Sequence, residues 1–143
     1  PASVNAPAPG KRPRSTIAPT IVCRDGRPQI AIGIPGASRI PTALLQTLID
    51  HLVLKRSLAD SIGDTRLHFT GGQGWNGPEK VEAEQSLAPE VVAALRNAGW
   101  PVELPEPAGT GHIFGGINAI ELNPDGSYTG YADPRRTNAA RGY

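Results

Sequence analysis

The sequence predicts an α/β layered fold in which helices lie between pairs of strands. Two β-type segments near the start are separated by a tight-turn signal, a helical pattern follows them directly, and the same alternation recurs later in the chain. The 143 residues have the length of a single domain, and a piece of a larger fold is equally compatible with that length.

The first two strands are predicted on either side of a hairpin turn. Val22 and the alternating segment Gln29 to Ile34 have strand-like patterns, and Asp25-Gly26 between them is a favoured two-residue turn. Cys23 is the only cysteine, so no disulfide forms within the chain. We expect its thiol to be buried and inert, because no base adjoins it in the sequence.

A Gly/Pro loop, Gly33 to Ala37, leads from the second strand into a helix. Apolar residues then recur at helical spacing at Ile40, Leu44, Leu45, Leu48, Ile49, Leu52 and Val53. Ser38 is a candidate N-cap, and Pro41 fits a first helical turn. Free N–H groups of Gly36, Ala37 and Ser38 would suit a carboxylate, a phosphate or a developing oxyanion. An ordinary strand-to-helix turn is the commoner meaning of such a motif, because Gly-rich turns often precede helices.

The remaining elements are predicted to be scaffold. Ser57, with Asp60 three residues on, resembles a capping box and starts a short helix that ends at Gly63. A second helix spans Pro89 to Asn97, with Gly99 after its end. Strands are expected at Arg66 to Phe69, Lys80 to Glu84, Val102 to Leu104, Ile117 to Leu122 and Ser127 to Tyr131, the last two joined by the turn Asn123 to Gly126.

Several other residues admit a functional and a structural interpretation. Trp75, in the Gly-rich loop Thr70 to Pro78, either lines a substrate entrance or plugs the loop onto the core. No common metal-ligand spacing relates the histidines, so we expect no metal site and place them on the surface or in the core. The histidines are His51, His68 and His112.

Composition excludes some classes of partner. The net charge of +1 gives no general attraction to nucleic acid, although the basic run Lys11 to Arg14 would attract an acidic substrate. No apolar run reaches the roughly 18 residues of a membrane helix. Residues 1–10 are rich in Pro and Ala and resemble an extended linker rather than a signal peptide. A single thiol does not indicate the compartment.

Three ordered blocks resemble the gamma-glutamyltranspeptidase family. They are Lys11 to Val22 with Asp25-Gly26 after it, Gly33 to Ile40, and Ala132 to Arg136. Each block is weak alone, but their order and spacing together are specific. The resemblance covers residues 11–143 and corresponds to the C-terminal part of that family's small catalytic subunit.

The resemblance implies a fold and a mechanism. The fold is the four-layer αββα sandwich of N-terminal-nucleophile hydrolases, completed by other subunits of the same processed proenzyme, so one sheet face of this chain should lie uncovered. In that family a self-cleaved proenzyme exposes an N-terminal threonine, which attacks an amide and forms an acyl-enzyme, without a cofactor. Pro1 has neither a hydroxyl nor a primary amine, so the resemblance places the threonine upstream. Either the chain is a piece of a longer protein, or the mature enzyme has an extra cut.

The resemblance also implies four site residues. Ser15 and Thr16 match the family's serine pair, which holds the alpha-carboxylate of a glutamyl substrate. Gly36 and Ala37 match two glycines whose N–H groups form the oxyanion hole. Alanine still donates its N–H there, provided that the loop needs no positive φ at this position.

Charged residues near these blocks have expected structural roles. Asp133, in the family-like Asp-Pro block, should lock the last strand near the site loops, and Arg39 should brace the oxyanion loop through an ion pair. We expect the carboxylates Glu79, Glu82 and Glu84 on a solvated strand face, because alternate residues of a strand point to the same side.

The sequence therefore indicates part of a gamma-glutamyltransferase or hydrolase acting on a gamma-glutamyl or other small acidic amide. The substitutions at Thr16 and Ala37 also fit the wider group of transpeptidase-like amidohydrolases and acylases, with a different acyl group. A non-catalytic binding module that retains the loops of Ser15-Thr16 and Gly36-Ala37 is a further alternative. A true transpeptidase would be periplasmic or secreted, and an amidohydrolase cytoplasmic.

Overall fold

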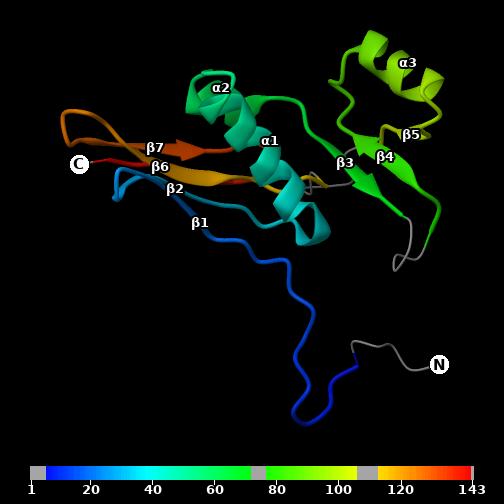
Figure 1. Ribbon diagram of the computed structural model, residues 1–143, viewed down its shortest axis with the longest axis horizontal. Helices are drawn as coiled ribbons and strands as arrows, with labels where there is room; N and C mark the ends of the chain where they lie inside the picture. Colours follow the sequence, from blue (N-terminus) through cyan, green and yellow to red (C-terminus); the bar gives the residue numbers. More distant parts are fainter. Residues whose placement is uncertain (1–5, 72–76, 106–112, 143) are drawn as a thin grey trace.

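The computed structural model describes residues 6–71, 77–105 and 113–142. Two sheets with helices packed on them form the fold (Figure 1). The antiparallel four-stranded sheet has the order β1-β2-β6-β7, and the three-stranded sheet has the order β3-β4-β5. The strands are β1 (Thr20–Arg24), β2 (Arg27–Gly33), β3 (Leu67–Thr70), β4 (Lys80–Ala83), β5 (Val102–Glu103), β6 (Asn118–Leu122) and β7 (Tyr128–Ala132). The helices are α1 (Ile40–Leu52), α2 (Leu58–Gly63) and α3 (Pro89–Asn97), with a short 3-10 turn η1 (Ala37–Arg39) before α1.

Local sequence signals predict most of these boundaries. At the β1–β2 turn Asp25 and Gly26 have φ angles of 51° and 74°, the left-handed pair that a tight hairpin requires. Ser57 accepts a 3.0 Å hydrogen bond from the N–H of Asp60 and thus caps α2. Ser38 is not an N-cap, so that prediction is wrong: η1 extends to Arg39, and no side chain caps the start of α1.

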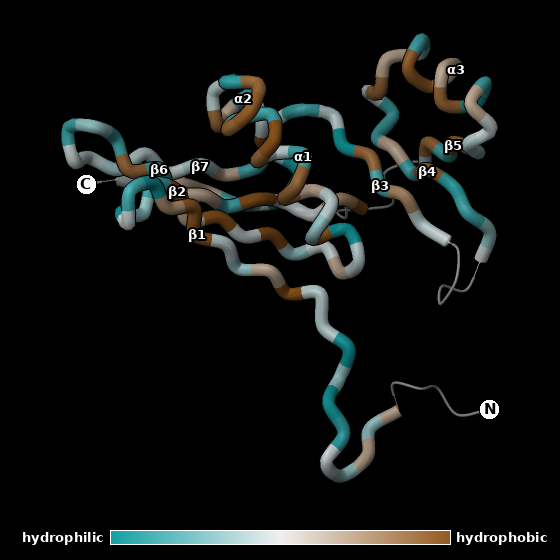
Figure 2. The backbone as a smooth tube through the Cα atoms, viewed as in Figure 1, coloured by the Kyte–Doolittle hydropathy of each residue, from teal (hydrophilic) through white to brown (hydrophobic). Residues whose placement is uncertain are grey.

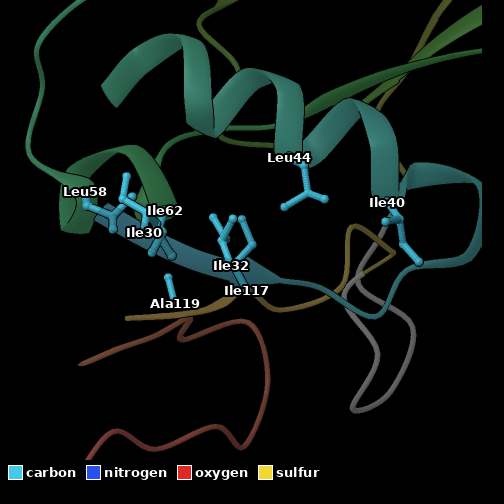
Figure 3. Close-up of a cluster of buried hydrophobic side chains, with 8 residues drawn as sticks. All are labelled: Ile30, Ile32, Ile40, Leu44, Leu58, Ile62, Ile117 and Ala119. Carbon is cyan, nitrogen blue, oxygen red and sulfur yellow. The ribbon is translucent and has the colours of Figure 1, made fainter. Parts of the chain in front are cut away.

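The main core lies between the four-stranded sheet and the helices α1 and α2. Leu44 follows Ile40 by one helical turn, so both side chains point to the same face of α1. Figure 3 shows these two residues above the isoleucines of β2, with α2 closing the end of the cluster. The buried residues of this core are Ile30, Ile32, Ile40, Leu44, Leu58, Ile62, Ile117 and Ala119.

The opposite face of the four-stranded sheet is largely open among the described residues, and the segment of Ala139, Ala140 and Arg141 borders it. The strand register places Ile21, Ala31, Ile120 and Gly130 in one row across all four strands. Ile21 is 67% exposed and Ile120 is 52% exposed. This apolar row borders a hollow of about 800 Å³, so the expected uncovered sheet face is present.

The edge of this sheet explains why Cys23 is exposed. The prediction of a buried thiol is wrong, because Val22 packs toward the core and the next side chain of the strand points away from it. A register shift between Val22 and Cys23 also interrupts the pairing of β1 with β2.

The second sheet is smaller and carries α3 on one face. Val81, Val92 and Val102 form its buried centre. Helix α1 joins the two sheets, because the Gln46 amide donates to the carbonyl of Leu67 at 2.8 Å and accepts from its N–H at 3.1 Å. These bonds satisfy the backbone at the free edge of β3.

The segment before β1 runs outside helices and strands from residue 6 to residue 19. It extends away from the four-stranded sheet (Figure 1), and its middle part is hydrophilic (Figure 2). That residues 1–10 act as a linker remains a prediction. Within the part of the chain that the structure describes, no helix is both long and apolar enough to cross a membrane.

Candidate functional site

The two predicted site loops lie side by side. The hydroxyl of Thr16 donates a 2.6 Å hydrogen bond to the carbonyl oxygen of Ala37, across 21 positions of sequence. Ser15 Oγ accepts a 3.2 Å hydrogen bond from the N–H of Ile17. The fold therefore brings together the two loops that carry the residues that the sequence indicated, Ser15 and Thr16 on one loop and Gly36 and Ala37 on the other.

Ala37 adopts a left-handed backbone conformation, with a φ angle of 49°. A side chain makes this conformation unfavourable by roughly 1–2 kcal/mol. The loop thus does need a positive φ here, and glycine would adopt it without that cost. Within the described residues, the N–H groups of Gly36 and Ala37 meet no backbone or side-chain acceptor.

A glycine from a distant segment supports this loop. Gly115 has a φ angle of 71°, and a Cβ atom on it would lie 1.7 Å from the carbonyl oxygen of Pro35. Only glycine allows so close an approach of two backbones. The sequence interpretation missed this residue. The pair Gly115-Gly116 shortly before β6 was the available signal, because glycines near a strand often mark a close backbone approach.

Arg39 braces the loop from the other side, as predicted. Its guanidinium forms an ion pair with Glu82 of β4, and its Cζ atom lies 5.9 Å from the centre of the Phe114 ring. Burial acts to raise the pKa of Glu82, but the hydrogen bond and charge of Arg39, assisted by Lys80, outweigh it and lower that pKa. Glu82 is therefore a paired carboxylate, and the prediction of a solvated strand face is wrong for it.

A buried ion network ties the end of β7 to the same region. Asp133 is fully buried and accepts hydrogen bonds from the N–H of Ile117 at 3.0 Å and from Nη2 of Arg66 at 2.6 Å. Arg66 also donates to the carbonyl of Phe114 at 3.4 Å. Both flanks of the Gly115-Gly116 pair are thus held, and the expected locking role of the Asp-Pro block is confirmed.

Arg135 extends this network to Glu84, the residue directly after β4. It donates to Glu84 Oε2 at 2.7 Å and to the carbonyl of Asp64 at 2.6 Å. Glu84 is therefore another paired carboxylate rather than a solvated one. Burial acts to raise the pKa of Asp133, but the N–H groups of Ile117 and Arg135 and the charge of Arg66 reverse the effect, so that the pKa lies below its ordinary value.

The histidines are parts of the fold where the structure describes them. His51 Nδ1 lies 2.9 Å from the carbonyl of Arg56, and His68 Nδ1 lies 2.9 Å from the hydroxyl of Thr42. His112 and Trp75 lie outside the described residues. Over residues 6–71, 77–105 and 113–142, no three potential ligand side chains converge on a metal-binding position.

Comparison with protein families agrees with this geometry. The family model described as gamma-glutamyltranspeptidase matches residues 1–143. The chain belongs to the gamma-glutamyltranspeptidase family. Among solved structures, gamma-glutamyltranspeptidase from Pseudomonas nitroreducens superposes with a TM-score of 0.81 at 28% identity, over 100% of this chain and 70% of that one. The expected α/β class is thereby confirmed.

Two curated relatives show the range of the gamma-glutamyltranspeptidase family. The glutathione hydrolase proenzyme of Escherichia coli is 33% identical over 131 residues, which cover 92% of this chain and 21% of the relative. The acylase ACY 1 proenzyme of Pseudomonas sp. (strain V22) is 34% identical over 125 residues, which cover 87% of this chain and 20% of the relative. The chain thus spans about a fifth of the length of these relatives.

Proposed function

We propose that this chain is the C-terminal part of the small subunit of a gamma-glutamyltranspeptidase-like enzyme, which transfers or hydrolyses a gamma-glutamyl or related acyl group. The 2.6 Å hydrogen bond between Thr16 and Ala37 carries this proposal. It joins a hydroxyl-bearing loop to a loop with free N–H groups, which suits a substrate that has a carboxylate next to the amide to be cleaved.

In this proposal the nucleophile is an N-terminal threonine of the parent proenzyme, outside residues 1–143. Its hydroxyl attacks the amide carbon, and its own amino group takes the proton. The amine leaves, and an acyl-enzyme remains until water or an acceptor amine attacks it. The residues of this chain bind and polarise the acyl group.

Ser15 and Thr16 have different parts in carboxylate binding. Ser15 Oγ accepts from the N–H of Ile17, so its own hydrogen is available to a substrate carboxylate. The Thr16 hydroxyl donates its hydrogen to the carbonyl of Ala37. It can therefore donate to a carboxylate only when that bond is broken. We therefore assign Ser15 as the direct carboxylate donor and Thr16 as the residue that also sets the position of Ala37.

Gly36 and Ala37 serve as the oxyanion hole. Their N–H groups would donate to the oxygen that becomes negative when the threonine attacks. Each such donor is worth about 3 kcal/mol of transition-state stabilisation. The positive φ of Ala37 turns its N–H and carbonyl away from the directions of a regular strand, and the carbonyl accepts from the Thr16 hydroxyl and from the N–H of Ile40.

The proposal also includes partner chains. The open apolar row of Ile21, Ala31, Ile120 and Gly130 is suited to pack against a second sheet supplied by other subunits of the same proenzyme. The relatives named above are described as proenzymes, which supports a processed assembly.

A gamma-glutamyl anilide assay of the complete parent protein tests the proposed function. We expect anilide release, and faster release when a dipeptide acceptor is added if transfer predominates. Intact mass spectrometry under denaturing conditions should find a partner chain that begins with threonine. A parent protein with no such chain and no release of the anilide would overturn the proposal and favour a non-catalytic binding module.

An acylase is the second candidate. The similarity to acylase ACY 1 proenzyme favours it, together with Thr16 and Ala37 at positions where the resemblance implies serine and glycine. Parallel assays with gamma-glutamyl anilide and with an acyl anilide that lacks the alpha-amino and alpha-carboxylate groups separate the two. Preference for the second anilide would identify an acylase.

A further inference from the structure

His68 of β3 connects α1 to the loop of Gly36 and Ala37. The residue is only 5% exposed, and its Nδ1 atom lies 2.9 Å from the hydroxyl oxygen of Thr42. That hydroxyl donates to the carbonyl of Arg39 at 3.1 Å. A threonine hydroxyl has one hydrogen. When that hydrogen goes to the carbonyl of Arg39, the bond between Thr42 and His68 uses a proton on Nδ1.

The other ring nitrogen has no partner. Nε2 of His68 is buried without a hydrogen-bond partner among the described residues. With the proton on Nδ1, a neutral ring leaves Nε2 as a bare acceptor, whereas a protonated ring would be a buried cation. Burial, and then the charge of Arg39, lower the pKa of His68, and Glu82 acts in the opposite direction.

The charged groups around His68 belong to the brace of the oxyanion loop. Glu82 stands directly opposite His68 in the β3–β4 register and pairs with Arg39 of η1 and with Lys80 at 3.4 Å. On α1, the polar groups near β3 are those of Thr42 and Gln46, which carry no charge. A positive His68 would repel Arg39 and compete with it for Glu82.

We propose that His68 is a positioning residue, which holds the Gly36–Ala37 loop in its active arrangement only while the ring is neutral with its proton on Nδ1. This inference rests on the proposed function, in which that loop binds the oxyanion. Arg39 connects His68 to the loop through two hydrogen bonds. Its N–H donates to the carbonyl of Gly36 at 3.0 Å, and its own carbonyl accepts from the hydroxyl of Thr42. The kcat of the complete enzyme should therefore depend on the titration of His68. The KM of the donor should change little, because Ser15 is not part of this chain of contacts.

Two substitutions separate the hydrogen bond from the titration. His68→Asn places an amide donor where Nδ1 stands and removes the titrating ring, so we expect kcat at pH 8 within about twofold of the wild-type value. His68→Leu removes the donor, and kcat should fall about tenfold at every pH, the scale of one lost hydrogen bond. His51→Asn, at the far end of α1, is the matched control.

The pH profile of kcat with gamma-glutamyl anilide, from about pH 4 to pH 8, is the decisive measurement. Because the pKa of His68 lies below the ordinary histidine value of about 6.5, the ratio of wild-type kcat to His68→Asn kcat should stay constant from pH 8 down to about pH 6.5 and should fall only at lower pH. The ratio of wild-type kcat to His51→Asn kcat should be constant over the same pH range. A flat His68→Asn ratio, or wild-type kcat in His68→Leu, would overturn the proposal.

An NMR measurement keeps this test distinct from a test of the proposed function. In the complete protein with ¹⁵N-labelled histidine, the imidazole signals of His68 should report the Nδ1-protonated neutral tautomer at pH 7 and should shift on Thr42→Val substitution. An Nε2-protonated ring would overturn the inference whether or not the anilide is hydrolysed. If His68 has the Nδ1-protonated tautomer but the protein turns over no gamma-glutamyl donor, the proposed function is rejected, and with it the dependence of kcat on His68.

Discussion

The hydroxyl of Thr16 and the carbonyl of Ala37 are joined by a 2.6 Å hydrogen bond that connects two loops far apart in the sequence. The same carbonyl receives the N–H of Ile40, the first residue of α1. Ala37 is thus held by the helix and by the hydroxyl loop together. The position of its N–H, the proposed oxyanion donor, depends on both bonds.

Removing the Thr16 hydroxyl should lower catalysis more than stability. Thr16→Val keeps the shape of the side chain but loses the donor, and the bond from Ile40 still satisfies the Ala37 carbonyl. We expect a roughly tenfold lower kcat/KM and a stability loss of about 1 kcal/mol. Thr16→Ser restores the donor and should stay near wild type. Equal kinetics of the valine and serine variants would show that the bond does not position Ala37.

Replacing Ala37 by glycine should relieve strain. The positive φ of 49° makes alanine unfavourable by roughly 1–2 kcal/mol, whereas glycine loses about 0.5–1 kcal/mol through its freer unfolded chain. Ala37→Gly should therefore leave the urea midpoint unchanged or raise it slightly. Ala94→Gly in α3, at an ordinary helical position, should destabilise by about 1 kcal/mol. Destabilisation of similar size in both variants would contradict strain at Ala37.

Short-range patterns predicted the elements well, but they did not predict the partners of buried charges. The turn at Asp25-Gly26 and the cap at Ser57 depend on neighbours within three residues, so the sequence displays them directly. Glu82 and Glu84 look like solvated residues of a strand, because their partners Arg39 and Arg135 lie 43 and 51 positions away. The contact of Gly115 with Pro35 was missed for the same reason, since only the folded chain brings those backbones together.

Gly115 should tolerate no side chain. A Cβ atom 1.7 Å from the carbonyl oxygen of Pro35 forces the oxyanion loop to move, so Gly115→Ala should destabilise by more than about 3 kcal/mol, beyond the usual range for one substitution. Gly126→Ala is the matched control, because Gly126 has a similar φ of 85° but no atom within 4 Å of the added Cβ. It should show only the backbone cost of about 1 kcal/mol. Urea denaturation of both variants measures the difference, and equal losses would show that the close approach does not matter.

Asp133 should be the carboxylate whose charge matters most to the stability of the fold. Asp133→Asn keeps an oxygen acceptor but leaves the buried Arg66 without its counter-charge, which should destabilise by about 3–5 kcal/mol. Asp125→Asn, at an exposed turn that also bonds a nearby N–H, should cost far less. Comparable losses in the two variants would contradict a special role for the buried ion network.

The stability of the fold at acid pH should depend on the same carboxylate, Asp133. Because the pKa of Asp133 is lowered in the folded state, the unfolded chain binds a proton first as the pH falls. The stabilisation from Asp133 is therefore complete above the unfolded pKa of about 3.9 and is lost as the pH falls through the lower folded pKa. Urea midpoints measured from pH 6 to pH 2.5 should decline more steeply for the wild-type protein than for Asp133→Asn. Parallel curves would mean that other carboxylates, and not Asp133, govern acid unfolding.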